Sequence, residues 1–258
     1  MLVFSAIAPH PPIIIPTVGK ENLAQLNATV EAMEKLEEKL FNCQPEVIII
    51  ISPHGPLLAD AFTVNVNTDY LGNLEDFGDF TTQLNFKNDL DLVSQIKNCA
   101  LSVSLTTFPK LDHGVMVPLY YLTKRLANIK IVPINYSLMD YQSHFKFGQE
   151  LKKIINKSKK RIAVIASGDL SHSLTASAPA GFTERAAEFD ETLIKLLINK
   201  DTDGIMNLPL DLIDQGNECG LRSIIILLGI LKDQDYQPDK LSYEGPFGVG
   251  YLVMDFKL

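Results

Sequence analysis

The chain is predicted to fold as a single α/β domain with three layers, in which a central sheet lies between two layers of helices. Short aliphatic runs alternate with amphipathic helical stretches, which is typical of a helix-flanked sheet rather than of separate α and β domains. Most of these runs are apolar on both faces, as in central strands that helices cover on each side. No linker or repeat divides the 258 residues, so we expect one domain over residues 1–258.

Six short apolar runs are expected to form a mostly parallel or mixed sheet. The clearest is Val47–Ser52, which consists almost entirely of β-branched residues and therefore favours a strand. A turn-like segment, Tyr243–Tyr251, leads into the last run, and its glycines fit a turn. The predicted strands are Leu2–Ala8, Val47–Ser52, Phe62–Asn67, Ile129–Ile134, Ile162–Ser167 and Val249–Phe256.

Five stretches carry apolar residues at helical spacing and are expected to be the covering helices. They are Glu21–Phe41, Val115–Leu126, Tyr141–Ile155, Ala186–Ile198 and Leu221–Lys232. The acidic stretch Asp69–Phe80, with Gly72 and Gly78, is predicted to be an exposed loop, either a plain connection or a lid.

Charge and composition exclude several classes of function. A formal net charge of −8 argues against a nucleic-acid partner, which needs a basic surface. No apolar run reaches the roughly 18 residues that span a bilayer, and the opening Leu2–Ala8 lacks the features of a signal peptide. Cys43, Cys99 and Cys219 show no paired spacing, as expected in a reducing compartment. We therefore expect a cytoplasmic protein with a small-molecule partner and no membrane contact.

Four of the five histidines lie in short polar or proline-flanked segments near predicted strands, namely His10, His54, His113 and His172. Loops at the carboxyl ends of strands surround the ligand crevice of an α/β sheet, so these imidazoles can converge. His10 and His54 follow the first two core strands, and each comes after a proline that keeps the chain extended. They are our predicted pair of metal ligands. His144 lies inside a predicted helix and is not expected to be functional.

The third metal ligand is harder to predict. Divalent iron is commonly held by two histidines and one carboxylate, and Glu218 stands at the start of the last apolar helix. An acidic residue there equally complements the helix dipole. Asp112, Asp169 and Glu244 are rival carboxylates, and Cys219 is a rival that suits zinc or copper(I). Spacing leaves these alternatives open.

Four motifs, in this order, resemble those of class III extradiol ring-cleavage dioxygenases of the protocatechuate 4,5-dioxygenase catalytic-subunit type. The motifs are His10-Pro11-Pro12, Ser52-Pro53-His54, Leu111-Asp112-His113-Gly114 and Ser167-Gly168-Asp169-Leu170-Ser171-His172. The resemblance extends from residue 1 to the C-terminus. It is nearest to the Memo-like and AmmeMemoRadiSam branch, which has segments similar to Glu218–Ser223 and Tyr243–Tyr251.

The resemblance implies a role for each of these residues. His10 and His54 would bind non-haem iron(II), and Glu218 would complete the triad. His172 would be the acid/base histidine, and His113 would contact substrate or reduced oxygen. Memo-like proteins instead associate a cysteine, at the position of Cys219, with their metal, which would suit zinc or copper.

Two main hypotheses follow. The first is an iron(II)-dependent extradiol dioxygenase-like enzyme that cleaves a catechol or aminophenol ring with dioxygen. The second is a metal-binding accessory protein of a radical-SAM-associated pathway, without ring cleavage. Such a protein could bind a partner of that pathway or form a homo-oligomer. A zinc hydrolase would use the same histidines around a polarised water. The aromatic residues that could grip a ring are Phe77, Phe80, Phe182, Tyr243 and Phe247.

Overall fold

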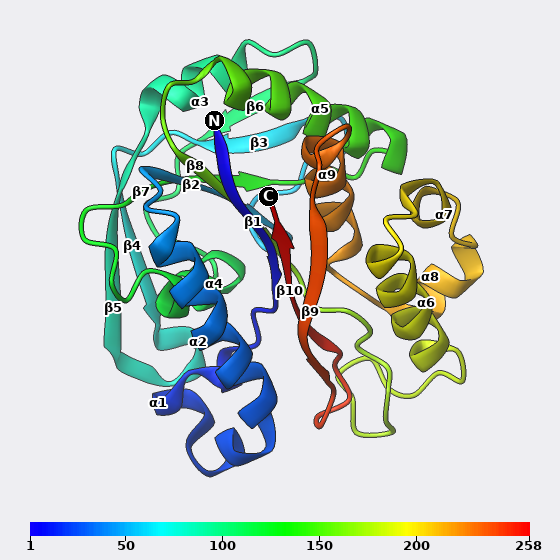
Figure 1. Cartoon of the computed structure of the whole chain (residues 1–258). Coiled ribbons are helices and arrows are strands. Elements are labelled where there is room, and N and C mark those ends of the chain that lie inside the picture. Colours follow the sequence, from blue (N-terminus) through cyan, green and yellow to red (C-terminus); the bar gives the residue numbers. More distant parts are fainter.

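Ten strands form one mixed sheet with helices against both faces in the computed structural model of the chain, which describes all residues from 1 to 258 (Figure 1). The main path through the sheet is β4-β5-β7-β2-β8-β1-β10-β9, and β3 pairs with β7 and β6. The strands are β1 Leu2–Ala8, β2 Val47–Ser52, β3 Phe62–Asn65, β4 Asp69–Leu74, β5 Asp79–Asn88, β6 Val103–Thr106, β7 Lys130–Asn135, β8 Ile162–Ser167, β9 Gln237–Glu244 and β10 Tyr251–Lys257.

Parallel pairing at the centre of the sheet determines where the functional loops emerge. β2 pairs in parallel with β7 and β8, and β8 pairs in parallel with β1. Ala8 is opposite Ser167 and Ser52 is opposite Asn135, so these strands end at the same edge. The segments that follow β1, β2 and β8, which carry three of the four predicted histidines, therefore start side by side.

Helices cover both faces of the sheet, which confirms the predicted α/β fold class. They are α1 Pro16–Gly19, α2 Asn27–Asn42, α3 Leu90–Lys97, α4 His113–Leu122, α5 Tyr141–Lys157, α6 Ala186–Ile198, α7 Thr202–Met206, α8 Leu210–Gly216 and α9 Leu221–Leu231, with short 3₁₀ helices η1 Pro12–Ile14, η2 Lys20–Leu26 and η3 Glu75–Phe77. None of the helices combines the length and the apolar character that crossing a membrane requires.

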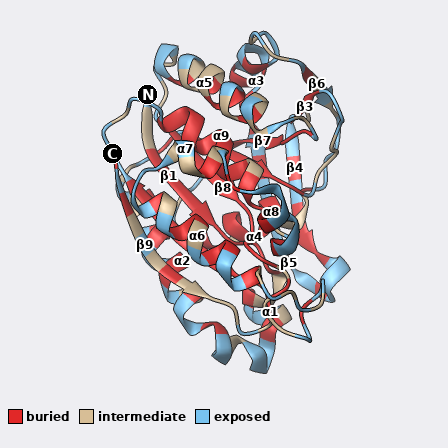
Figure 2. Cartoon of the chain, turned by 90° about the vertical axis from the view of Figure 1, so that its right-hand side faces the viewer, coloured by how far each residue is buried: buried red, intermediate tan, exposed pale blue.

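Two apolar clusters, one on each face, make the core. Ile49 and Ile51 of β2 pack in the cluster that contains α5 and α9, whereas Ile48 and Ile50 pack in the cluster that contains α2 and α4. Alternate side chains of a strand point to opposite faces, so a run of isoleucines serves both clusters. Figure 2 shows the resulting buried band along the sheet and the inner sides of the helices.

The prediction that Asp69–Phe80 forms an exposed loop is wrong. This stretch forms β4, η3 and the start of β5, and β4 and β5 pair as an antiparallel hairpin. Tyr70 is opposite Phe86 in the hairpin, and both side chains are buried. Tyr70 and Leu74 face the core, Gly72 packs against Met116, and the acidic residues Glu75 and Asp76 lie at the exposed tip.

Other expectations also need correction, and β6, α3, α7 and α8 were not predicted. The helix predicted over Glu21–Phe41 begins only at Asn27, after the 3₁₀ helix Lys20–Leu26. Strand β9 was not predicted at all, because Gln237–Glu244 is largely polar and contains Pro238. It lies at the edge of the sheet, where proline is tolerated because one side of the strand has no partner.

Candidate metal centre

Three of the predicted histidines meet at the carboxyl edge of the sheet. A ligand nitrogen from each of His10, His54 and His113 lies within 4.8 Å of the other two. The rings of His54 and His113 stack with centroids 4.0 Å apart, and His10 meets His54 edge to face at 4.7 Å. The fourth histidine, His172, follows the end of β8, which lies beside the end of β1.

Hydrogen bonds fix the ring of His10. Its backbone N–H donates to Asp169 Oδ1 at 2.9 Å, and its Nδ1 lies 2.8 Å from Ser167 Oγ. The single hydroxyl proton of Ser167 goes to the carbonyl of Gly114, so the serine oxygen accepts from His10 Nδ1–H. The neutral ring therefore carries its proton on Nδ1 and has a free lone pair on Nε2, which is the arrangement of a metal-binding histidine.

The free nitrogen of His10 faces His54. The two Nε2 atoms are 2.9 Å apart, which allows both to lie at about 2.0–2.2 Å from one ion. Burial lowers the pKa of His10 well below its usual value and that of His54 to about 4. Both rings are thus neutral at physiological pH, as metal binding requires. This donor pair fits a divalent transition metal.

Asp112 connects β2 to the start of α4 through one of its two carboxylate oxygens. Its Oδ1 accepts from Ser52 Oγ at 2.6 Å and from the backbone N–H of Val115 at 3.1 Å, so it caps α4. His113, the first residue of α4, follows directly. An added Cβ on Gly114 would lie 2.4 Å from Ser52 Oγ, so only glycine lets the helix approach β2 this closely.

His172 is held by its backbone and has a free ring nitrogen. Its N–H donates to the carbonyl of Gly216 at 3.0 Å. Its Nδ1 is buried and has no hydrogen-bond partner. Burial lowers the pKa of the ring below its usual value. The side chain is therefore a neutral imidazole that can accept a proton.

Glu218 caps the start of α9, which was the alternative role predicted for it from the sequence. Its Oε2 accepts from the backbone N–H of Leu221 at 2.5 Å, at the start of α9. Burial raises the pKa of this carboxyl to about 7. The group of converging donor atoms contains His113 and not Glu218. A role for Glu218 as the third ligand stays a prediction.

Of the other rival carboxylates, Asp169 is near the histidine pair and Glu244 caps a helix. Asp169 Oδ2 lies 4.0 Å from His10 Nε2, and burial raises its pKa to about 7. Glu244 Oε1 accepts from the backbone N–H and the hydroxyl of Thr29, at the start of α2. Glu244 therefore has a structural partner in another part of the fold.

Cys219 lies beside the histidine pair. Its Sγ is 3.5 Å from His10 Nε2 and accepts from the backbone N–H of Asp169 at 3.3 Å. Burial raises the pKa of the thiol well above its usual value. The cysteine is brought here by a close contact of two backbones, because an added Cβ on Gly168 would lie 2.2 Å from Gly220 Cα.

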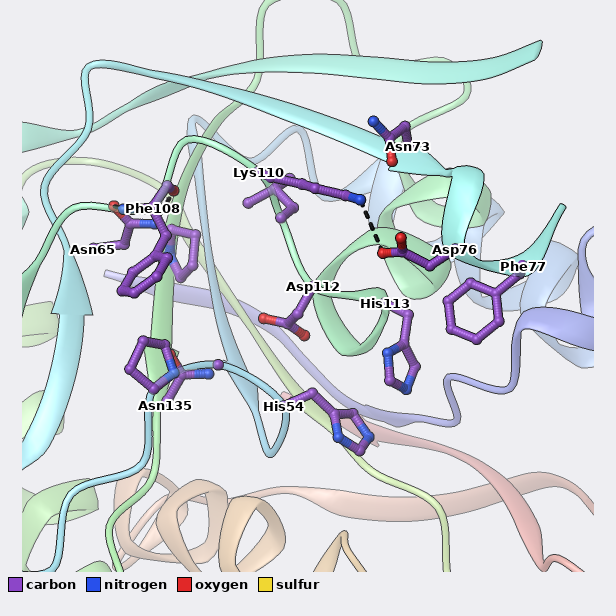
Figure 3. Close-up of a pocket in the computed structure, with 14 residues that line it drawn as sticks. His54, Asn65, Asn73, Asp76, Phe77, Phe108, Lys110, Asp112, His113 and Asn135 are labelled. Carbon is purple, nitrogen blue, oxygen red and sulfur yellow. Dashed lines mark hydrogen bonds and ion pairs between the residues drawn. The ribbon is translucent and has the colours of Figure 1, made fainter. Parts of the chain in front are cut away.

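A cavity of about 550 Å³ opens beside His54 and His113 (Figure 3). This volume is within the range of small-molecule sites. Its polar wall includes Asn73, Asp76 and Lys110, none of which was predicted as a site residue. The available signal was proximity in sequence, because Lys110 precedes the Asp112-His113 motif by two residues.

Only one of the predicted aromatic candidates lines this cavity. Phe77 does so, and its ring centroid is 5.2 Å from that of His113. Phe80 and Phe182 are mostly exposed to solvent outside it. Tyr243 donates to Asp190 Oδ2 at 2.6 Å. The second aromatic residue of the cavity wall, Phe108, was not predicted.

Comparison with protein families agrees with the site. Residues 5–254 match the family model of the catalytic LigB subunit of aromatic ring-opening dioxygenase. The chain belongs to this LigB family. The match confirms the resemblance to class III extradiol dioxygenases and covers nearly all of the sheet and every residue of the histidine cluster. Members of the class use a metal, which agrees with a cluster that could hold one.

Individual relatives include dioxygenases and Memo-like proteins. The chain is 33% identical to Protein CA_C1420 of Clostridium acetobutylicum over 96% of its own length and 56% of that protein. It is 26% identical to the 2,3-dihydroxyphenylpropionate/2,3-dihydroxicinnamic acid 1,2-dioxygenase of Azotobacter vinelandii, over 66% of this chain and 57% of that one. A MEMO1 family protein of Methanococcus vannielii is 28% identical over 72% of this chain and 63% of its own length.

The chain therefore spans a little over half the length of the first two of these relatives. Among solved structures, the uncharacterized protein JW3007 of Escherichia coli aligns with a TM-score of 0.69 over 98% of this chain and 99% of its own. The two sequences are 18% identical, so this similarity shows a shared fold.

Proposed function

We propose that this chain is an extradiol dioxygenase-like enzyme that binds iron(II) and cleaves the ring of a catechol or aminophenol with dioxygen. The observation that carries the proposal is the pair of Nε2 atoms of His10 and His54, 2.9 Å apart beside a cavity of about 550 Å³. A metal ligand pair next to a space large enough for a substituted ring is what this reaction needs. In this proposal residues 1–258 form one catalytic domain.

His10 and His54 are the proposed iron ligands, with Glu218 as the third. Two neutral imidazoles and one carboxylate leave iron(II) with a single net positive charge and open positions for substrate and dioxygen. Glu218 Oε2 already accepts from the Leu221 N–H, so in this proposal Oε1 is the oxygen that binds the metal.

Iron(II), when bound, would provide the electronic connection between the aromatic ring and dioxygen. The chain supplies the proton transfers. His172 accepts a phenolic proton, since burial lowers the pKa of its ring and keeps the imidazole neutral. His113, beside His54 at the cavity wall, donates a hydrogen bond to oxygen atoms on which negative charge develops.

The second candidate function is a Memo-like metal-binding accessory protein of a radical-SAM-associated pathway, without ring cleavage. The observation that favours it is the position of Cys219, whose Sγ is 3.5 Å from His10 Nε2. A thiolate ligand would select a softer metal, zinc or copper(I). The similarity to a MEMO1 family protein supports this alternative.

Anaerobic loading with iron(II), metal analysis and then oxygen uptake over a panel of catechols tests the proposal. We expect one iron per chain and a ring-opened product that contains both atoms of the consumed oxygen. The His54→Ala variant is the control and should neither hold iron nor consume oxygen. Full iron loading without oxygen uptake on any catechol or aminophenol would reject ring cleavage and favour the accessory protein.

A further inference from the structure

The mouth of the cavity carries one pair of opposite charges. Lys110 Nζ donates to Asp76 Oδ2 at 2.8 Å, as the dashed line in Figure 3 shows. Both side chains are exposed, Lys110 to 45% and Asp76 to 74%. The other acidic side chain in the cavity wall is Asp112, whose Oδ1 caps α4 and which lies deeper, next to His54 and His113 (Figure 3). At the mouth of the cavity, a ligand thus meets one cation and one anion.

The backbone fixes this charge pair relative to the metal centre. Leu71 of β4 donates to the carbonyl of Pro109 and accepts from the N–H of Leu111, both at 2.8 Å. Lys110 is therefore held against β4, the strand that leads directly into Asp76. The chain then continues from Lys110 to His113 of the metal cluster, so the backbone places this charge pair at the same cavity as the metal ligands.

A third polar group of the cavity has no partner within the protein. The Oδ1 atom of Asn73 is buried and makes no hydrogen bond. The other two asparagines of the wall differ, since Asn65 donates to the carbonyl of Phe108 and Asn135 to that of Ser52. A buried carbonyl without a donor is unfavourable unless a ligand supplies one. Asn73 thus indicates a ligand with a hydrogen-bond donor near Asp76.

Aromatic residues define where the ring lies. Phe77 stands next to His113 with ring centroids 5.2 Å apart, and Phe108 lies on the opposite part of the wall (Figure 3). Both rings are largely exposed to the cavity and solvent, at 40% and 50%. A flat ring whose hydroxyls face His54 would lie between them. Its substituent would then extend towards Lys110 and Asp76.

We propose that the cavity selects an aromatic substrate whose substituent is zwitterionic, with a carboxylate for Lys110 and an ammonium for Asp76 and Asn73 Oδ1. The inference rests on the proposed function and specifies its substrate class. An exposed ion pair is weak, so exchanging its partners costs little. A substituent with one charge would leave either Lys110 or Asp76 unpaired next to it, whereas a zwitterion pairs both and keeps the mouth neutral.

Binding of four catechols to the iron-loaded protein under anaerobic conditions, measured by calorimetry, tests this inference. The probes are 4-methylcatechol, 3,4-dihydroxyphenylpropionate, dopamine and L-DOPA, whose substituents are neutral, anionic, cationic and zwitterionic. We expect L-DOPA to bind on the order of tenfold more tightly than 4-methylcatechol, since it gains charge-assisted hydrogen bonds. The two singly charged probes should gain much less.

Two variants identify the residues responsible. Lys110→Met and Asp76→Asn should each bring the ratio of L-DOPA to 4-methylcatechol affinity close to one. Lys153→Met is the matched control, because Lys153 forms an exposed ion pair of 2.6 Å with Glu150 on α5, and it should keep the ratio of the unmodified protein.

The outcomes separate this inference from the proposed function. If 4-methylcatechol binds as tightly as L-DOPA, or if a singly charged probe binds most tightly, the zwitterion site is rejected while the catechol site stands. If Lys110→Met and Asp76→Asn keep the preference for L-DOPA, these residues are not its cause and the inference is rejected. If no catechol binds to the iron-loaded protein, the proposed function itself is rejected.

Discussion

The two walls of the metal centre differ in how completely their polar groups are paired. On the inner wall, His10 is fully buried, and its backbone and Nδ1 are bonded to Asp169 and Ser167. On the outer wall, His54 and His113 are partly accessible and face the cavity. The inner wall fixes a ligand before any metal arrives, and the outer wall leaves room for a substrate. Rigidity and access are thus supplied by different strands and loops.

The largest expected effect comes from removing the Nε2 atom of His10 or of His54, which face each other across the metal centre. His10→Ala and His54→Ala should each abolish stoichiometric metal binding and leave the fold intact, because the strands and not these loops make the core. Metal analysis tests the first statement and circular dichroism the second. A double variant that still holds one metal ion per chain would contradict the assignment of the site.

Substitutions of Glu218 and Cys219 test which of the two side chains is the third metal ligand. Under the dioxygenase proposal, Glu218→Ala should lower iron(II) affinity by much more than the roughly 10–100-fold of a change outside the ligand set, and Cys219→Ser should have a milder effect. Competition with a chelator under anaerobic conditions measures both. The reverse order would make Cys219 the ligand and favour zinc or copper(I) and the accessory function.

The hydrogen bond behind His10 tests the rigidity of the inner wall. Ser167→Ala removes the acceptor of His10 Nδ1–H and should lower metal affinity by about 10–100-fold. Ser5→Ala is the matched control, because Ser5 is buried in the neighbouring strand and bonds only the carbonyl of Phe256. Equal metal affinity in the two variants would show that Ser167 does not orient the ligand.

The mildest perturbation is a change of pH, which alters metal affinity without any substitution. The pKa of Glu218 is raised to about 7, so below pH 7 the metal must displace its proton. Affinity should then fall about tenfold per pH unit from 7 to 5 and be nearly constant above 7. His54, with a pKa of about 4, adds a second proton only near pH 4.

If Cys219 were the third ligand, metal affinity would depend on pH in a different way. Because burial raises the pKa of Cys219 well above its usual value, a Cys219 ligand would have to lose a proton at every accessible pH. Affinity would then keep rising about tenfold per unit above pH 7. Such a rise would contradict Glu218 as the third ligand, independently of any substitution.

Periodicity predicted the central strands well because burial on both faces leaves a strong mark on the sequence. Val47–Ser52 is a continuous aliphatic run and is β2 in the structure with the same bounds. The hairpin of β4 and β5 leaves a weaker mark, since one side of it is solvated and its tip is acidic. β9 was missed for the same reason: an edge strand needs few apolar residues.

The sequence by itself determined the α/β fold class, the family resemblance and the proximity of the histidines, because residues that directly follow parallel strands must emerge at one edge of the sheet. Only the tertiary structure decided that His10 Nε2 faces His54 Nε2, that Asp112 and Glu244 cap helices, and that Lys110 and Asp76 pair at the cavity. These facts depend on the directions of side chains and on contacts between distant segments. Spacing along the chain carries no information about either.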